Sequence, residues 1–524
     1  MFDYLIRNVQ ILDGSGAPAR PGSVALKGGR IAAVGHMPGA ESVHVIEGRN
    51  RTLTPGFIDI HRHADAALFR PGFGRAELAQ GLTTIINGNC GLSLAPVAGP
   101  YTEAVLEYLA PVTGWTEEAF PTLADYRART NRAPLPLNAG MLAGMGTLRA
   151  CVTGFEDRAL TDDEYRRLHA MLERTLADRA VGVSLGLGYA PECFYTTSQL
   201  IRALSPLRGC GLPVAVHMRQ EGDGVVESLG EMLEVARALE IPVQISHLKG
   251  IGRRNWRKAV PEMLRRIARA REDGLDVMCD VYPYPAGSTQ LIHVLPPEFQ
   301  SGGLDALTAA LRDPSERREM RRRMERDSDF ENIVALAGFE NIRAASLRQP
   351  ENAAVEGCSI AEIAAAEGKD PYDALFDLLA SERCAASMID FIADESDIED
   401  ILRAPFSGVI SDATYPVGLA HPRVCGAFPR LLEAYVKERG VLTLPEAVHK
   451  LTRQPADRFR LTGKGRVEPG ADADLCLFDP AEIHETGTWR EPDRLARGMD
   501  WVFVNGLPAI AEGAFTGSAA GRLL

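Results

Sequence analysis

Histidines, one cysteine and one aspartate stand directly after short apolar runs of this sequence, where their side chains could share a metal ion. His61 and His63 follow the run FIDI, His217 closes VAVH and His247 closes VQISH. Residues i and i+2 of a strand point to the same face, so His61 and His63 form a pair that can hold one ion. A lone histidine is more often a core or surface residue, but four of the eleven histidines close strand-like runs. The pattern therefore predicts a metal centre.

Cys90 and Asp412 complete the predicted set. Cys90 follows TTIINGN and lies between glycines in GNCGLS, which indicates a tight turn rather than a packed core. A thiolate is a soft anionic ligand that suits zinc and can bridge two ions. Asp412 follows GVIS, where a carboxylate could take a proton from water and return it to a leaving nitrogen. A helix N-cap is its structural alternative. His293 and His421 stay undecided, and the other histidines receive no role.

Strand-like and helical stretches alternate between residues 55 and 465, which predicts a parallel sheet. After FIDI, the strand candidates are TTIINGN, LPLNAGM, VGVSLGLG, LPVAVHM, IPVQISHL, LDVMCDVY, IVALAG and FSGVISD. About eight such units over roughly 400 residues predict an α/β fold, a TIM-like (β/α)8 barrel, whose active site lies at the C-terminal ends of its strands. The candidate ligands stand at those ends.

Both ends of the chain show a different sequence pattern, in which short runs of alternating apolar and polar residues are separated by Gly-rich turns. We expect residues 1–54 and 466–524 to fold together as a small β-sandwich domain, and residues 55–465 to form the catalytic barrel. The alternation of strand-like and helical stretches is interrupted near residues 296–341, which include the charged stretch DPSERREMRRRMERDSDFEN. We interpret this as an insertion and prefer a solvated surface helix to a cover over the site.

Composition limits the partners. The 524 residues carry a formal net charge of -13, which argues against a nucleic-acid or membrane partner because both need a cationic face. An anionic small-molecule substrate would need a local basic pocket. The N-terminus lacks the pattern of a secretory signal and no run approaches 18 apolar residues, so we expect a cytoplasmic protein. Nine scattered cysteines suit reduced thiols.

The sequence resembles the D-aminoacylase, or N-acyl-D-amino-acid deacylase, family of the amidohydrolase superfamily over essentially its whole length. The segments that carry the resemblance are PGFIDIHRHAD, GNCGLS, the Y-x-P of GLGYAPECFY, HMRQEGD, ISHLKG, DVYPYPAGST, SDATYPVGLAHPR with GAFPR, LTRQPADRFRL and ADADLCLFDP. The resemblance implies zinc-dependent hydrolysis of the amide bond of N-acyl-D-amino acids, which gives a carboxylic acid and a free D-amino acid. The D stereochemistry rests on the resemblance alone.

The resemblance also implies the metal ligands. One tightly bound Zn²⁺ would lie on Cys90, His217 and His247, and a second, weaker site on His61 and His63 would share Cys90. Many binuclear amidohydrolases bridge their metals with a carboxylated lysine, and Cys90 occupies the matching position.

The substrate contacts are implied in the same way. Lys249, Tyr282 and Arg423 would clamp the free α-carboxylate and so supply the basic pocket, with Asp412 as the proton acceptor. A guanidinium can meet a carboxylate with two parallel hydrogen bonds, which favours Arg423. Tyr189 in GLGYAP is a candidate donor to the scissile carbonyl.

The sequence departs from the family pattern at Ala413, where many relatives have glycine, and at LTGKG. Two alternatives remain: a cyclic-amide hydrolase of the hydantoinase or dihydroorotase type, against which Cys90 and the HPR segment argue, and a catalytically inactive binding protein. The side chain, acyl group and oligomeric state stay open, with apolar side chains as the default expectation.

Overall fold

The computed structural model describes residues 1–326 and 329–524, and eight parallel strands form its centre. In chain order these strands are β6 (Phe57–Asp59), β7 (Leu82–Asn87), β8 (Asn138–Gly144), β9 (Gly182–Gly186), β10 (Val214–His217), β11 (Val243–Ile245), β12 (Val277–Val281) and β16 (Ser407–Val409). Beyond the ends of β6 and β16, the amide of Asp412 donates to the carbonyl of His61 and the amide of His63 donates to that of Ala413, both at 2.9 Å. These bonds close the sheet, which confirms the predicted (β/α)8 barrel.

Helices cover the barrel because its strands are buried on both faces, as every residue of β7 and β8 is. A typical one, α5, begins at Thr161, whose hydroxyl accepts from the amide of Glu164 in a capping box. The helices are α1 (Arg75–Ala79), α2 (Thr102–Thr113), α3 (Leu123–Thr130), α4 (Met145–Thr153), α5 (Asp162–Ala177), α6 (Thr197–Ala203), α7 (Val225–Leu239), α8 (Ala259–Glu272), α14 (Glu395–Arg403), α15 (Arg423–Arg430), α16 (Leu444–Leu451) and α17 (Arg453–Arg458). Within the described residues, no helix is long and apolar enough to span a membrane.

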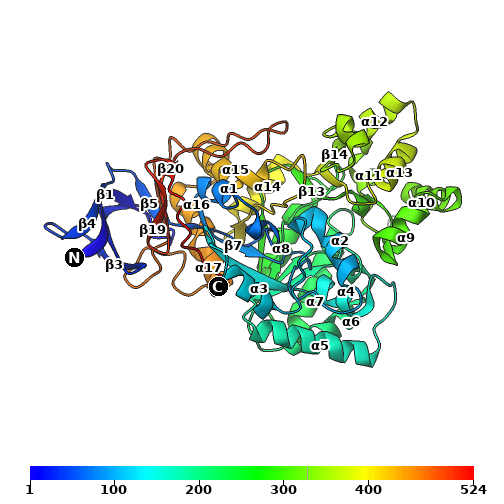
Figure 1. Cartoon of the computed structure of the whole chain (residues 1–524), viewed down its shortest axis with the longest axis horizontal. Helices are drawn as coiled ribbons and strands as arrows, with labels where there is room; N and C mark the ends of the chain where they lie inside the picture. The colour runs from blue at the N-terminus through cyan, green and yellow to red at the C-terminus, as the bar shows by residue number, and fades with distance from the viewer. Residues whose placement is uncertain (327–328) are drawn as a thin grey trace.

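The two chain ends share one sheet at the side of the barrel (Figure 1). Its strands are β1 (Phe2–Ile11), β2 (Arg20–Lys27), β3 (Arg30–Gly35), β4 (Ser42–Glu47), β5 (Thr52–Pro55), β17 (Leu475–Phe478), β18 (Met499–Val504), β19 (Leu507–Ala511) and β20 (Ala514–Phe515). The junction is the antiparallel pair β5–β17, and the sheet packs on an apolar core of its own. The separate sheet domain built from both ends is thus confirmed, while its proposed limits stay a prediction.

A long excursion separates β12 from β16 and extends beyond the predicted 296–341 range on both sides. Before α14, its described residues contain an antiparallel sheet and several α-helices: β13 (Ala286–Gln290), β14 (Ile342–Ala345), β15 (Ser387–Phe391), α9 (Gly303–Ala310), α10 (Pro314–Arg326), α11 (Ile333–Ala337), α12 (Ile360–Glu367) and α13 (Pro371–Ser381). Its helices α9 to α13 lie at the end of the molecule opposite the terminal sheet (Figure 1).

One strand prediction in this excursion is wrong. The run IVALAG forms helix α11, because the side chain of Asn332 accepts from the amide of Ala335 and so caps a helix start. Residues 314–326 of the charged stretch form α10, on which only Met320 and Met324 are buried, and residues 327–328 of the stretch lie outside the described residues. The preferred interpretation as a surface helix therefore agrees with α10, but not with the end of the stretch, where Glu331 lines the cavity of the site.

Candidate metal centre and active site

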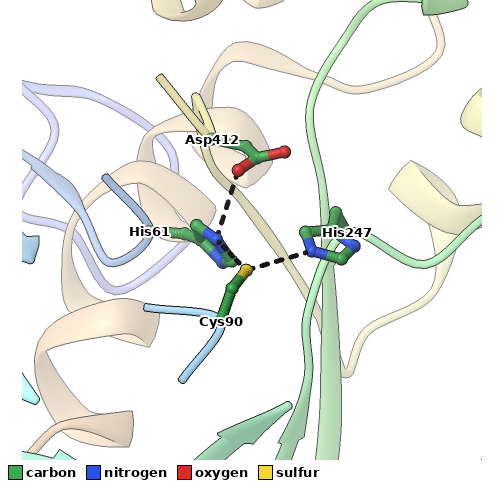
Figure 2. Close-up of side chains that lie close together, drawn as sticks. All are labelled: His61, Cys90, His247 and Asp412. Carbon is green, nitrogen blue, oxygen red and sulfur yellow. Dashed lines mark hydrogen bonds and ion pairs between the residues drawn. The ribbon is translucent and has the colours of Figure 1, made fainter. Parts of the chain in front are cut away.

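Three predicted metal ligands, His61, Cys90 and His247, and the predicted base, Asp412, converge at the C-terminal mouth of the barrel (Figure 2). The Sγ atom of Cys90 lies 3.2 Å from Nε2 of His61 and 3.5 Å from Nε2 of His247. Oδ1 of Asp412 lies 3.2 Å from the same His61 nitrogen. All four side chains are buried. Residues that follow barrel strands β6, β7, β11 and β16 thus direct their polar atoms toward one point.

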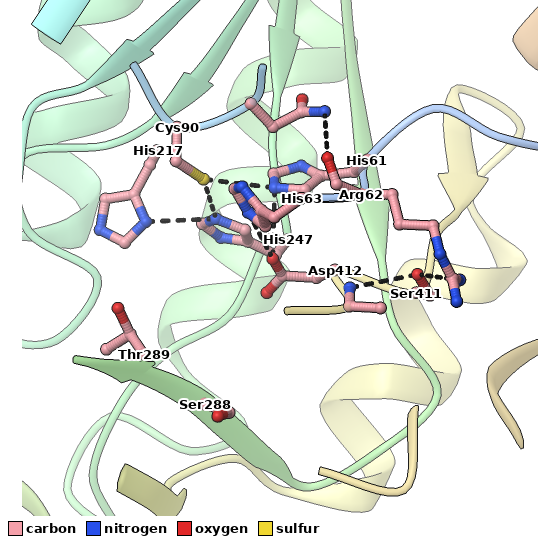
Figure 3. A network of polar contacts seen from close by, with 12 residues as sticks. His61, Arg62, His63, Cys90, His217, His247, Ser288, Thr289, Ser411 and Asp412 are labelled. Atoms are coloured by element: carbon pink, nitrogen blue, oxygen red, sulfur yellow. Dashed lines mark hydrogen bonds and ion pairs between the residues drawn. The ribbon is translucent and has the colours of Figure 1, made fainter. Parts of the chain in front are cut away.

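His63 and His217 extend this cluster (Figure 3). Nε2 of His63 lies 3.4 Å from Oδ1 of Asp412, and Nδ1 of His217 lies 3.2 Å from Nε2 of His247. Burial lowers the pKa of His63 to about 4 and that of His217 to about 3, so both imidazoles are neutral and keep a lone pair. The structure therefore brings together all five predicted ligands and the predicted base.

The donor set fits a metal ion. Among the described residues, two overlapping groups could hold one. The first is His61, Cys90, His247 and Asp412, and the second is His217, Glu221 and His247. Burial, together with the carboxylate of Asp412, raises the pKa of Cys90 well above its usual value. A bound cation counteracts this shift because it stabilises the thiolate. Thiolate, imidazole and carboxylate ligands in one buried cluster are typical of zinc sites.

Backbone conformation aims these side chains inward. Cys90, His247 and Asp412 have positive φ angles of 53°, 37° and 53°, a region that non-glycine residues rarely adopt and that is frequent at active sites. Each follows the last residues of a barrel strand, so the left-handed turn rotates the side chain into the mouth. Gly91 must be glycine, since its φ is 73° and a Cβ there would lie 2.8 Å from the backbone nitrogen of Gly186.

Glu221 joins the site although the sequence did not single it out. Its Oε1 lies 2.9 Å from Nδ1 of His247, and both its oxygens accept from Nζ of Lys249 at 2.8 Å. The bond to Glu221 leaves Nε2 of His247 free for the metal cluster, as partner carboxylates of metal-bound histidines do. Burial opposes the charge of Glu221, but Lys249 offsets it and keeps the pKa of Glu221 below its usual value. Its place in HMRQEGD, four residues after His217, was the available signal.

The three predicted carboxylate-binding residues lie together. The ring of Tyr282 stands between the two cations, 5.7 Å from Nζ of Lys249 and 4.7 Å from Cζ of Arg423. Arg423 is fully buried, and its Nη1 pairs with Oδ2 of Asp412 at 2.9 Å. Burial raises the pKa of Asp412, but Arg423 and His61 more than offset this and hold it well below the usual value. Both cations therefore already face carboxylates.

Tyr189 packs against the metal cluster. Its ring lies 4.3 Å from that of His217, measured between centroids, and its hydroxyl is 3.2 Å from Oγ1 of Thr289. Thr289 and Ser288 lie on β13, in front of the cluster (Figure 3). The hydroxyl of Tyr189 is thus directed toward the excursion.

A cavity of about 710 Å³, its mouth included, opens over the cluster. Lys249 and Tyr282 line it on the barrel side, while Arg423 lies behind this wall. The excursion supplies much of the opposite wall, through Thr289, His293, Glu331, Ile333, Asp390 and Ile392. Burial raises the pKa of Asp390 to about 6 and that of Glu331 to about 7. This wall is therefore part of the site. The sequence did not predict that residues after the charged helix α10, such as Glu331 and Ile333, would line the cavity.

Comparison with known proteins gives consistent matches over the whole chain. The amidohydrolase family model matches residues 44–506. The D-aminoacylase of Alcaligenes xylosoxydans xylosoxydans is 35% identical and is aligned over 100% of this chain and 97% of its own. Similar solved structures include the following two. N-acyl-D-glutamate deacylase from Bordetella bronchiseptica, complexed with zinc and a phosphonate mimic of the tetrahedral intermediate, has 30% identity and a TM-score of 0.86 over 100% of this chain and 99% of its own. A D-aminoacylase with a binuclear metal center has 32% identity and a TM-score of 0.83 over 100% of both chains.

Proposed function

The chain belongs to the D-aminoacylase, or N-acyl-D-amino-acid deacylase, family of amidohydrolases, and we propose that it hydrolyses N-acyl-D-amino acids to a carboxylic acid and a free D-amino acid. The observation that carries this proposal is the convergence of Cys90, the four strand-end histidines and Asp412 at the mouth of the barrel. The full-length similarity to deacylases supports the substrate class.

We propose Zn²⁺ as the metal, bound tightly by Cys90, His217 and His247. A weaker second site on His61 and His63 would share Cys90. The surroundings of the imidazoles support this difference in affinity. Glu221 orients His247, whereas Nδ1 of His61 and Nδ1 of His63 have no hydrogen-bond partner within the described residues. Ligands that are oriented by a hydrogen bond hold metals more tightly than ligands that are not.

The bound metal would polarise the scissile carbonyl and make water a better nucleophile near neutral pH. Asp412 would take the proton of the attacking water and pass it to the departing nitrogen, because its carboxylate borders the cluster and stays ionised. Lys249 and Tyr282 line the cavity and would bind the α-carboxylate, supported from behind by the charge of Arg423. Tyr189 would donate a hydrogen bond to the carbonyl once its hydroxyl turns from Thr289.

Two alternative functions account less well for these residues. A cyclic-amide hydrolase of the hydantoinase type would bridge two metals with a lysine, and this chain has Cys90 at that position. It also would not require a pocket for a free carboxylate. A catalytically inactive binding protein would have no need for an ionised carboxylate beside the donor cluster.

The proposal is tested by amino-acid release from matched N-acetyl-D- and N-acetyl-L-amino acids, with purified protein of measured zinc content. We expect release from the D series only, its loss after chelation, and its return when zinc is added. Bound zinc with no release from either series would overturn the substrate assignment and would turn attention to cyclic amides. Release without metal would overturn the mechanism.

Replacing Glu221 by glutamine should weaken zinc binding by about 10- to 100-fold, the usual cost of losing a carboxylate partner of a metal-bound histidine. The amide keeps the shape of the side chain but removes the charge that faces His247 and Lys249. Competition with a chromogenic chelator measures this affinity. Asp390→Asn is the matched control, because Asp390 is a buried carboxyl of the same cavity and belongs to neither donor group. Equal zinc affinity of Glu221→Gln and the wild type would contradict the orienting role.

A further inference from the structure

A second chamber adjoins the catalytic cavity. Four residues, Gly188, Arg219, His293 and Glu331, line both spaces and so form their common wall. The chamber measures about 470 Å³, its open mouth included. Its remaining lining comes from the barrel and the excursion: Leu187, Cys193, Gln220, Leu295, Pro297, Gln300, Asp329 and Phe330. A group that extends from the catalytic cavity past His293 would enter this chamber.

Two buried polar side chains of the chamber wall have unused hydrogen-bonding atoms. His293 is 7% exposed and Gln300 is 5% exposed. Neither ring nitrogen of His293, nor Oε1 of Gln300, has a partner among the residues that the structure describes. Buried polar atoms are normally paired, and an unpaired one destabilises the protein unless water or a ligand binds it. Both residues therefore need a partner that can enter the chamber.

Their orientation is fixed by packing. The His293 ring lies 4.1 Å from the ring of Tyr189, centroid to centroid. Nε2 of Gln300 donates to the carbonyls of Ile292 and Leu295 at 3.3 and 3.5 Å, which leaves Oε1 as the free acceptor. Burial lowers the pKa of His293 to about 3, so the ring is neutral and offers one N–H donor and one acceptor.

The charges around the chamber disfavour an acidic ligand. Arg219 is its lining cation, but Nε and Nη2 of Arg219 donate to the carboxylate of Glu231 at 2.9 and 2.8 Å, and Nη1 donates to the carbonyl of Cys193 at 2.7 Å. The carboxyl groups of Asp329 and Glu331 line the same space. A second carboxylate would thus find no unpaired cation among the described residues that line the chamber, because Arg219 is already neutralised. An uncharged group with both a donor and an acceptor matches the free atoms.

We propose that His293 and Gln300 form a subsite for an uncharged amide group of the substrate. The amide carbonyl would accept from the N–H of His293, and the amide N–H would donate to Oε1 of Gln300. This inference rests on the proposed deacylase function and narrows it, because it replaces apolar substrates by amide-bearing ones. The amide belongs either to the amino-acid side chain or to the acyl group.

Two pairs of substrates distinguish these sources. N-acetyl-D-glutamine against N-acetyl-D-methionine varies the side chain at nearly constant length, and N-succinamoyl-D-leucine against N-4-methylpentanoyl-D-leucine varies the acyl group. We expect kcat/KM to favour the amide by about tenfold or more in one pair, because a site built for hydrogen bonds discriminates against a substrate that lacks them. No preference for the amide in either pair would overturn the subsite. So would a stronger preference for the matching carboxylate in the pair that shows one, which is N-acetyl-D-glutamate for the side chain and N-succinyl-D-leucine for the acyl group.

Variants link the preference to these residues. In His293→Leu and Gln300→Met the amide-to-apolar ratio should fall toward one, because neither replacement offers the lost hydrogen bond. Leu295→Met, a volume-conserving change in the same wall, should keep the ratio. An unchanged ratio in both test variants would overturn the assignment.

A binding experiment separates this inference from the proposed function. Calorimetric titration of the zinc-loaded Asp412→Asn protein with the same pairs gives affinities without turnover, and we expect the same tenfold preference. If the wild type hydrolyses the apolar substrates and binding shows no amide preference, only the subsite is overturned. If no N-acyl-D-amino acid is bound or hydrolysed, the proposed function is overturned and the subsite with it.

Discussion

Asp412→Asn is expected to lower kcat by about two orders of magnitude or more while the protein keeps at least one zinc. Asparagine has the shape of aspartate and can still contact His61 and Arg423, but it cannot accept a proton from water, and general acid–base transfer contributes on this scale. The tight site proposed on Cys90, His217 and His247 does not include Asp412, so one zinc should remain. Steady-state kinetics together with elemental analysis of the dialysed protein measure both quantities.

The control for this prediction is Asp397→Asn. Asp397 is also a buried aspartate, and it lies at the start of α14. Its carboxylate accepts a hydrogen bond from the amide of Arg257 and does not line the cavity. Its variant should keep kcat close to that of the wild type. If Asp412→Asn retains near-normal turnover, another group moves the proton. If it loses turnover and all of its zinc, Asp412 is a ligand of the tight site and its role as base stays unsupported.

Cys90→Ser should have an effect of similar size through the metal. Sγ of Cys90 lies 3.2 Å from His61 and 3.5 Å from His247, so it is the donor that the two proposed metal sites share. A serine hydroxyl is far less acidic than a thiol and a much poorer ligand for zinc. Zinc should fall below one equivalent per chain after dialysis, and kcat/KM should fall by about two orders of magnitude or more because the Lewis acid is lost.

Cys279→Ala provides the comparison for this variant. Cys279 is a buried cysteine of barrel strand β12 and belongs to neither group of donor atoms. Its replacement should therefore leave the zinc content unchanged. A Cys90→Ser protein that keeps stoichiometric zinc and full activity would contradict the shared thiolate ligand and would reopen the comparison with lysine-bridged amidohydrolases.

Local sequence patterns were sufficient to predict the barrel and the set of side chains at its mouth. Buried strands appear as short apolar runs, and the residue that ends each run must lie at the same edge of a parallel barrel. His61 and His63 are separated by one strand period, and Cys90 has glycine on the C-terminal side where the turn needs it. These relations depend on neighbours in the chain, which is why a sequence reveals them.

The composition of the cavity wall depended on the tertiary structure. The bond from Glu221 to His247, the pairing of Arg423 with Asp412, and the approach of His293 to Tyr189 join segments that lie apart in the chain. The run IVALAG was mistaken for a strand because a short apolar run is compatible with either structure, and the Asn332 cap decided for a helix.

Some features could be predicted from the sequence and others could not because the interactions that determine them act over different distances along the chain. Hydrophobic period and turn chemistry act over a few residues and determine where each strand ends and which side chain closes it. Contacts between loops are selected by packing and by the need to pair buried polar groups, and these depend on how the whole excursion between β12 and β16 folds over the barrel. The sequence by itself therefore determined the family, the barrel and the candidate metal donors, whereas the tertiary structure decided which groups orient those candidates and which side chains line the cavity.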